Sequence, residues 1–107
     1  MKGITGGILM PRSITLQQLG QLMPTHPQII DIREPYEFAR YHLPTAKNVP
    51  YHSLTMYPER FMNTQETYYL ICEHGSVSYR AASILASYGY KTVTVTGGYE
   101  SKGYRRC

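Results

Sequence analysis

The sequence has only two cysteines and no apolar run near the roughly 20 residues that a membrane-spanning helix needs. At the N-terminus, only Ile8, Leu9 and Met10 form an apolar stretch before Pro11, whereas a secretory signal needs about 7 to 15 apolar residues. A small secreted domain stabilised by disulfides would also have more cysteines. We therefore expect a cytoplasmic protein with reduced thiols and no membrane partner.

Internal repeats, low-complexity tracts and internal linkers are absent as well. A length of 107 residues lies near the usual size of one domain. We expect residues 1–11 to form a flexible N-terminal tail and residues 12–107 to form a single domain with one active site. The sequence does not indicate which oligomeric state the protein has.

Positive charge is modest, at a formal net +4, and part of it comes from Lys102, Arg105 and Arg106. An excess of this size suits small anions as well as nucleic acids. The eleven tyrosines are dispersed along the chain and do not alternate with a basic patch. We expect no nucleic-acid partner.

Short apolar runs alternate with helical patterns along the chain. The runs predict strands at residues 28–32, 46–49, 68–71 and 92–95. The predicted helices begin at Thr15 with a capping box to Gln18, at Glu34-Pro35, at Ser53, and at Ser76 or Ser78, the last one ending at Gly89. This order predicts an α/β fold with a small, mainly parallel central sheet flanked by helices. Ligands of such folds bind at the carboxyl ends of the strands.

Cys72 directly follows the strand expected at residues 68–71 and precedes the clearest helix of the chain. The first turn of a helix offers unpaired N–H groups and the positive end of the helix dipole. Such a site stabilises a thiolate nucleophile, and equally a persulfide, Cys–S–S⁻. Cys72 is therefore the candidate catalytic residue. The alternative is a buried small residue that closes a strand.

The loop after Cys72 supplies the candidate substrate-binding residues, which are Glu73, His74, Gly75, Ser76, Val77 and Ser78. Gly75 is expected to permit a close backbone approach, or to be an ordinary turn glycine. Glu73 and His74 either tune the thiolate or are simply solvated. No second Cys-x-x-Cys or histidine pair accompanies Cys72 and His74, so we expect no metal.

Three segments together resemble the rhodanese family. Residues 29–38 (IIDIREPYEF) are similar to the family's I-D-V-R-E-x-x-E-F signature, and residues 42–50 (HLPTAKNVP) to its H-I-P-G-A-x-N-I-P segment. Residues 70–90, with the pair Gly97-Gly98, resemble the family's cysteine block and closing glycines. The resemblance runs from about Ile14 to Tyr104. It implies a rhodanese-like fold and a single-domain sulfurtransferase, in which Cys72 takes a sulfane sulfur from a small-molecule or protein donor and passes it to a thiol acceptor without any cofactor.

Several residues depart from the family's pattern. Val77 stands where the loop often has arginine, and Glu73 where many members have a basic residue. We therefore expect thiosulfate to be a poorer donor than a persulfide or polysulfide, with Arg80 or the basic C-terminal residues supplying some positive charge. Tyr41 and Thr45 replace usual glycines, which we expect to affect local packing, and the tryptophan that commonly follows the glycine pair is missing.

Three further positions have a structural and a chemical interpretation. Asp31 and Arg33 are expected to brace the active site by charge-assisted hydrogen bonds, or to be an ordinary ion pair at a strand end. We expect His42 to be a hydrogen-bonded structural residue. Cys107 either takes sulfur from Cys72 by forming a disulfide or is a bystander at the end of the chain.

Two rival functions share this kind of fold. A phosphatase loop has five residues between its cysteine and an arginine, which would place the arginine at position 78, where this chain has Ser78. Arg80 comes two positions too late to bind an oxyanion from the same loop. The other rival is a non-catalytic binding or regulatory module, against which the presence of Cys72 argues.

Overall fold

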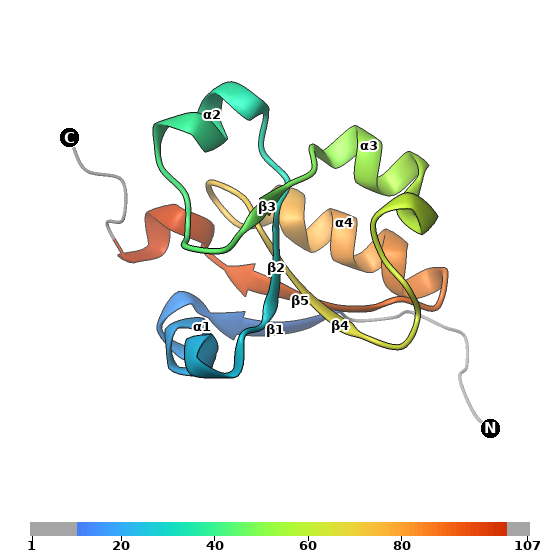
Figure 1. Ribbon diagram of the computed structural model, residues 1–107, viewed down its shortest axis with the longest axis horizontal. Helices are drawn as coiled ribbons and strands as arrows, with labels where there is room; N and C mark the ends of the chain where they lie inside the picture. The colour runs from blue at the N-terminus through green and yellow to red at the C-terminus, as the bar shows by residue number, and fades with distance from the viewer. Residues whose placement is uncertain (1–10, 103–107) are drawn as a thin grey trace.

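The computed structural model describes residues 11–102 of the chain. In this part the strands form one parallel sheet in the order β1 (Arg12–Thr15), β5 (Lys91–Thr96), β4 (Thr67–Ile71), β2 (Gln28–Asp31) and β3 (Lys47–Asn48). The connecting helices are α1 (Leu16–Leu22), α2 (Pro35–Arg40), α3 (Tyr51–Met56) and α4 (Ser76–Ser87), with the short 3₁₀ helices η1 (Met23–Thr25), η2 (Pro58–Arg60) and η3 (Gly98–Lys102) (Figure 1). The predicted α/β architecture with a parallel sheet flanked by helices is confirmed.

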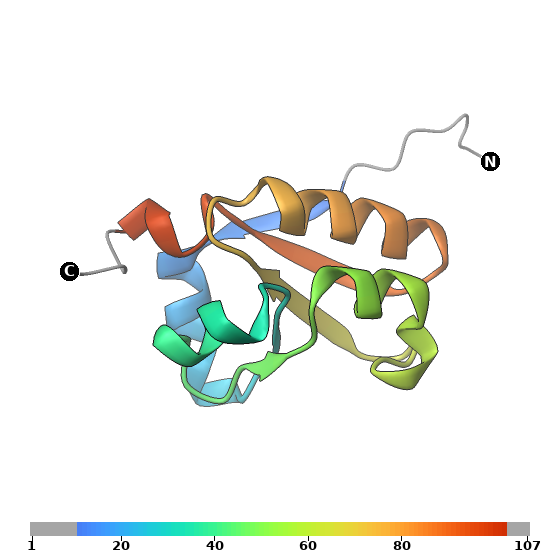
Figure 2. The same cartoon turned by 90° about the horizontal axis from the view of Figure 1, so that it is seen from above.

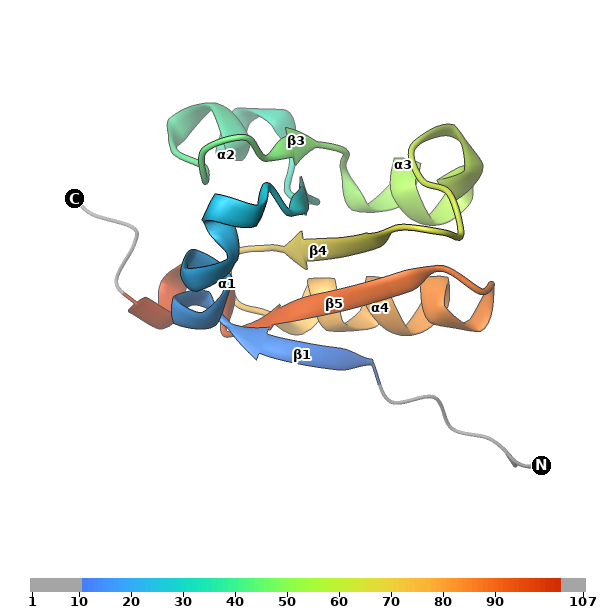
Figure 3. The ribbon, with the colours of Figure 1, turned by 60° about the horizontal axis from the view of Figure 1, so that its bottom comes forward.

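Apolar side chains cover both faces of the sheet. Because side chains alternate along a strand, Tyr68, Leu70 and Cys72 pack into the core beneath α3 and α4, while Tyr69 and Ile71 pack into the core beneath α1. Figure 3 shows α1 and α4 on opposite sides of the sheet. Cys72 therefore faces the layer that contains α4, and its sulfur can reach the start of that helix.

Two predicted helix ends are confirmed. Thr15 and Gln18 exchange the bonds of a capping box, from Thr15 N to Gln18 Oε1 at 2.8 Å and from Gln18 N to Thr15 Oγ1 at 3.0 Å. Gly89, with φ of +95°, follows α4, and the N–H of Tyr90 reaches back to the carbonyl of Leu85 at 3.1 Å. This left-handed glycine and the 6→1 bond define a Schellman C-cap.

Two element predictions were wrong. The sequence did not predict β1, in which Ile14 is half-buried and the other three residues are polar and exposed. An edge strand such as β1 pairs on one side only and needs little apolar surface, so it lacks the apolar run of a central strand. The third helix begins at Tyr51 after Pro50, so Ser53 lies inside α3 and does not cap it. Pro58 follows the end of α3 because proline cannot continue a helix, and it opens η2 instead.

Some predictions lie outside the described residues. These are the tail over residues 1–10 and the roles of Arg105, Arg106 and Cys107. Within residues 11–102, no helix combines the length and the apolar character needed to cross a membrane.

Candidate active site at Cys72

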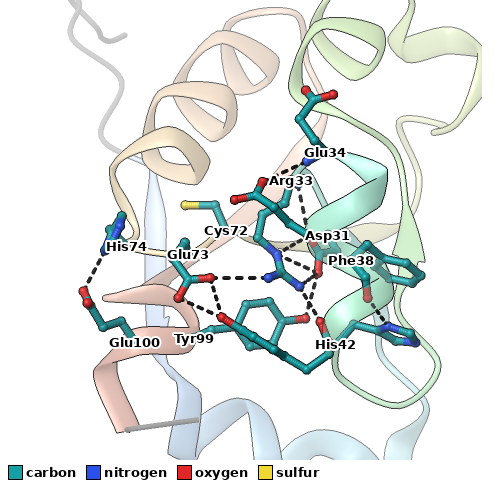
Figure 4. Close-up of polar contacts among 12 residues, drawn as sticks. Asp31, Arg33, Glu34, Phe38, His42, Cys72, Glu73, His74, Tyr99 and Glu100 are labelled. Atoms are coloured by element: carbon teal, nitrogen blue, oxygen red, sulfur yellow. Dashed lines mark hydrogen bonds and ion pairs between the residues drawn. The ribbon is translucent and has the colours of Figure 1, made fainter. Parts of the chain in front are cut away.

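Cys72 follows the last residue of β4, at the carboxyl end of the sheet and next to the start of α4 (Figure 4). The loop from β4 to α4 runs beside η3 (Figure 2). Its Sγ accepts the N–H groups of Gly75 at 3.1 Å and Ser78 at 3.3 Å. The side chain is only 4% exposed, so the two N–H groups act on the sulfur in a largely dry environment. The sulfur is thus both a core atom and an acceptor of main-chain hydrogen bonds.

Gly75 allows the loop to turn into the helix. It is the N-cap of α4, with φ of +99°, and a Cβ on it would lie 2.6 Å from the Gly97 nitrogen. The close approach expected for this glycine is therefore present, together with a left-handed conformation that disfavours other residues. The predicted caps Ser76 and Ser78 were wrong, because Gly75 occupies the N-cap and both serines lie within the helix.

Ser78 holds the first turn of α4 from inside. Its side chain is buried, donates to the Gly75 carbonyl at 3.2 Å and shares a hydrogen bond with Thr94 Oγ1 at 2.7 Å. Thr94 belongs to β5, so this bond ties the start of α4 to the neighbouring strand. The N–H of Ser78 is thereby held where it meets the sulfur of Cys72.

The closing glycine pair brings η3 against the cysteine loop. The N–H groups of Tyr99 and Glu100 donate to the carbonyls of Cys72 and Glu73 at 3.1 and 3.0 Å. A Cβ on Gly98 would lie 2.2 Å from the Cys72 carbonyl oxygen, so only glycine permits this contact. The loop is consequently fixed by main-chain bonds on the side facing η3.

Asp31 and Arg33 form the charge-assisted bonds that the sequence predicted. Arg33 Nε and Nη2 donate to Asp31 Oδ1 and Oδ2 at 3.0 and 2.8 Å, and both side chains are buried. The guanidinium carbon lies 4.2 Å from the centroid of the Tyr99 ring and 4.9 Å from that of the Tyr41 ring, which suits cation–π contacts. Burial on its own would lower the pKa of Arg33, but the bonds and charge of Asp31 outweigh it and raise the pKa, so the residue stays charged.

Glu73 is drawn into this cluster and away from simple solvation. Its Oε1 accepts Arg33 Nη1 at 3.3 Å (Figure 4). Its two oxygens accept the hydroxyl of Tyr41 at 2.8 and 2.9 Å. The sequence treated Glu73 and Tyr41 as separate departures from the family's pattern. In the structure the two residues bond each other. The only sign of this contact in the sequence is that both residues occur in the same chain.

Tyr99 is the residue of this site that the sequence missed. Its side chain is fully buried, and its hydroxyl donates to Asp31 Oδ2 at 2.8 Å while accepting the N–H of Leu43 at 2.9 Å. Burial raises the pKa of Tyr99, and the nearby Asp31 carboxylate raises it further. A tyrosine after a glycine pair offers no local pattern that reveals such contacts.

A cavity of about 350 Å³ opens beside the sulfur. Its lining includes residues of the cysteine loop together with side chains from other segments, namely Ile32, Arg33, Glu34, Glu37, Tyr51, His52, Cys72, Glu73, His74, Ser76 and Val77. At the exposed rim, His74 Nδ1 lies 2.6 Å from Glu100 Oε1. Arg80 lies on the exposed surface of α4 and is not part of this lining.

His42 is fixed by contacts with Phe38. His42 Nδ1 lies 2.7 Å from the Phe38 carbonyl oxygen, and the ring stacks on Phe38 at 3.7 Å, which is the structural role expected of it. Within residues 11–102, histidine, cysteine and acidic side chains do not gather in groups of three that could hold a metal ion.

The structure thus has a cysteine sulfur that accepts main-chain hydrogen bonds at the start of a helix, at the carboxyl edge of a parallel sheet. Comparison with known proteins gives the family to which such a chain belongs. The model of the Rhodanese-like domain family matches residues 15–101. The chain therefore belongs to the rhodanese-like domain family.

Individual relatives agree with this assignment. The thiosulfate sulfurtransferase GlpE of Ectopseudomonas mendocina is 30% identical, over 83% of this chain and 82% of that protein. A rhodanese-like domain protein from Staphylococcus aureus superposes with a TM-score of 0.75 at 30% identity, over 84% of this chain and 89% of that one. The reduced Bacillus anthracis CoADR-RHD has the same fold, with a TM-score of 0.80 at 24% identity. Its match covers 88% of this chain, which spans only 17% of that longer protein.

Proposed function

We propose that this protein is a rhodanese-type sulfurtransferase that carries a sulfane sulfur on Cys72. The observation that carries the proposal is the pair of N–H groups, from Gly75 and Ser78, directed at the Cys72 sulfur. Such donors stabilise negative charge on sulfur, first on the thiolate and then on the persulfide. The activity named for the GlpE relatives supports the same function.

The proposed reaction has two displacement steps. The Cys72 thiolate attacks the sulfane sulfur of a donor, which is a persulfide, a polysulfide or, less favourably, thiosulfate. The sulfur–sulfur bond of the donor breaks, and its electron pair leaves with the donor's remaining thiolate or sulfite. An acceptor thiolate then attacks the outer sulfur of the Cys72 persulfide and returns Cys72 as thiolate. Neither step needs a metal, an organic cofactor or an oxidant.

The other site residues divide by what they contact. Glu73, His74, Ser76 and Val77 line the cavity and would contact the donor, while the N–H groups of Gly75 and Ser78 would hold the sulfur anion. Asp31 and Arg33 would brace the loop through Glu73. The contribution of Arg80 stays a prediction.

The test is sulfur loading measured by intact-protein mass spectrometry. The protein is treated separately with glutathione persulfide, polysulfide and thiosulfate. We expect a gain of one sulfur atom that dithiothreitol removes. Cys72→Ser should abolish the gain, because the serine hydroxyl is not a nucleophile at neutral pH, while Cys107→Ser should retain it.

Loading of Cys72→Ser to the same extent as the unaltered protein would contradict the proposal. Failure of all three donors with the unaltered, folded protein would also contradict it and would favour a non-catalytic binding or regulatory module. If only thiosulfate fails to load sulfur, the result agrees with the proposal, because the Glu73 carboxylate repels a dianionic donor.

A further inference from the structure

The cavity beside Cys72 carries more negative than positive charge. Within residues 11–102, its lining contains the carboxylates of Glu34, Glu37 and Glu73 and one guanidinium, that of Arg33, besides two imidazoles. The chain as a whole has the opposite sign, at +4. The local charge is therefore a feature of this site and does not follow from the composition.

Arg33 offers little positive charge to a ligand, because the nitrogens of its guanidinium already donate to other groups of the protein. Nε and Nη2 bond Asp31, Nη2 also donates to the Tyr41 carbonyl at 2.7 Å, and Nη1 faces Glu73 at 3.3 Å. One buried cation is thus met by two carboxylates. The group formed by Asp31, Arg33 and Glu73 has a net charge of −1.

Glu73 is the carboxylate of this group that lines the cavity, and it is held in place. The Tyr41 hydroxyl donates to both of its carboxylate oxygens, and the side chain is 17% exposed. A carboxylate fixed in this way directly follows Cys72 in the chain and lines the same cavity. Its field acts on any donor that approaches the sulfur, since a partly buried charge is screened less than a fully exposed one.

We infer that Glu73, held by Tyr41 and Arg33, selects sulfur donors by charge. The preferred donors are persulfides that carry an ammonium group near the sulfane sulfur, and dianionic donors such as thiosulfate are disfavoured. The inference rests on the proposed function, because it names the substrate class of the same cysteine.

The chemistry of loading is the same for every donor in this class. The Cys72 thiolate bonds to the outer sulfur of R–S–SH, the S–S bond of the donor breaks, and R–S⁻ leaves with the electron pair. The proton stays with the transferred sulfur, giving Cys72–S–SH. Only the charge on R changes the electrostatic energy of approach.

The experiment uses a matched series of donors, the persulfides of 2-aminoethanethiol, 2-mercaptoethanol and 3-mercaptopropionate. These place an ammonium, a neutral hydroxyl and a carboxylate at similar distances from the sulfur. The rate of loading is measured by rapid acid quench and intact-mass spectrometry. We expect each step, from ammonium to hydroxyl to carboxylate, to slow loading about threefold to tenfold, the effect of one unit charge across several ångströms in a partly hydrated site. Thiosulfate should be slower still.

A pair of variants assigns the effect to Glu73. Glu73→Gln keeps the shape of the side chain and one acceptor oxygen but removes its charge, and should bring the rates of the three donors closer together and speed thiosulfate by about threefold to tenfold. Glu66→Gln removes one charge at the opposite end of β4, where Glu66 accepts a bond from Gln28, and should leave the donor order unchanged. Raising the ionic strength should weaken the preference of the unaltered protein.

The outcomes separate the two claims. Equal rates for the three donors, or faster loading by the carboxylate donor, would overturn the charge inference while leaving the proposed function standing. No loading by any donor would overturn the proposed function itself. Because the donor series is run on the unaltered protein, poor folding of Glu73→Gln cannot hide either result. If that variant folds and keeps the full donor preference, the claim that Glu73 selects donors by charge is wrong.

Discussion

Tyr99 shows how one buried hydroxyl links separate parts of the site. It donates to Asp31 and accepts from the Leu43 backbone, and its ring lies against the Arg33 guanidinium. Burial and the Asp31 carboxylate both favour its neutral form, so its pKa is raised above the ordinary value of about 10. The folded protein therefore keeps this proton at a pH where the unfolded chain releases it.

The raised pKa predicts the effect of alkaline pH on stability. A group with a raised folded pKa contributes its full stabilisation below the unfolded pKa, and loses it as pH rises toward the folded pKa. Tyr99→Phe should lower the free energy of unfolding by about 1–3 kcal/mol at neutral pH through the lost hydrogen bonds. The variant should then lose stability less steeply than the unaltered protein above a pH of about 10.

Urea unfolding at a series of pH values measures both effects. Tyr57→Phe, at an exposed tyrosine, is the matched control and should follow the unaltered protein. Parallel stability curves for Tyr99→Phe and the unaltered protein above a pH of about 10 would contradict the assignment.

At the scale of elements, α4 lies between two left-handed glycines that differ in their surroundings. Gly75 at its start and Gly89 after its end have φ of +99° and +95°. A Cβ on Gly75 would meet the Gly97 backbone, whereas a Cβ on Gly89 would meet nothing within 4 Å. The same substitution therefore separates the cost of a left-handed conformation from the cost of a close contact.

Alanine at these two positions should give different results. Gly89→Ala should lower the free energy of unfolding by about 1 kcal/mol and leave sulfur loading unchanged, since only the helix end is strained. Gly75→Ala should cost more stability and slow loading strongly, because the loop must move away from Gly97 and carry its N–H away from the Cys72 sulfur. Denaturant unfolding and mass spectrometry measure the two effects. Unchanged loading in a folded Gly75→Ala variant would show that this N–H does not matter.

At the scale of the whole molecule, a buried polar cluster joins elements on both faces of the sheet. Asp31 at the end of β2, Arg33, Tyr41, Glu73 and Tyr99 meet at its carboxyl edge, beside the cavity of Cys72. The charged members of the cluster are largely shielded from water, so they stabilise the fold only while each charge is paired with an opposite one.

Removal of one charge should therefore be costly. Asp31→Asn leaves the Arg33 guanidinium buried without its main carboxylate, and arginine is too basic to lose its charge at neutral pH, so we expect a loss of about 3–5 kcal/mol in the free energy of unfolding. Glu100→Gln breaks the exposed pair with His74 and should cost at most about 1 kcal/mol. Urea unfolding compares the two variants, and similar costs would show that the buried pair contributes no more than the exposed one.

The order of elements after β1 could be predicted because its signals are local. The apolar run before Cys72, the Thr15–Gln18 capping box and the glycine after α4 are each read within a few residues of sequence. The position of Cys72 between a strand and a helix followed from the same signals. The wrong caps at Ser53 and Ser76 arose because a serine has the same sequence signature whether it precedes a helix or lies within its first turn.

By itself, the sequence determined the alternation of strands and helices after β1 and the place of Cys72 between a strand and a helix, since periodicity and capping act between near neighbours. Only the tertiary structure decided that Glu73 and Tyr41 close over Arg33, that Tyr99 bonds Asp31, and that Gly75 must pass against Gly97. The physical reason is that these contacts join residues far apart in the chain. Their bonds and charges acquire their strength only when packing of the sheet and helices removes water between them.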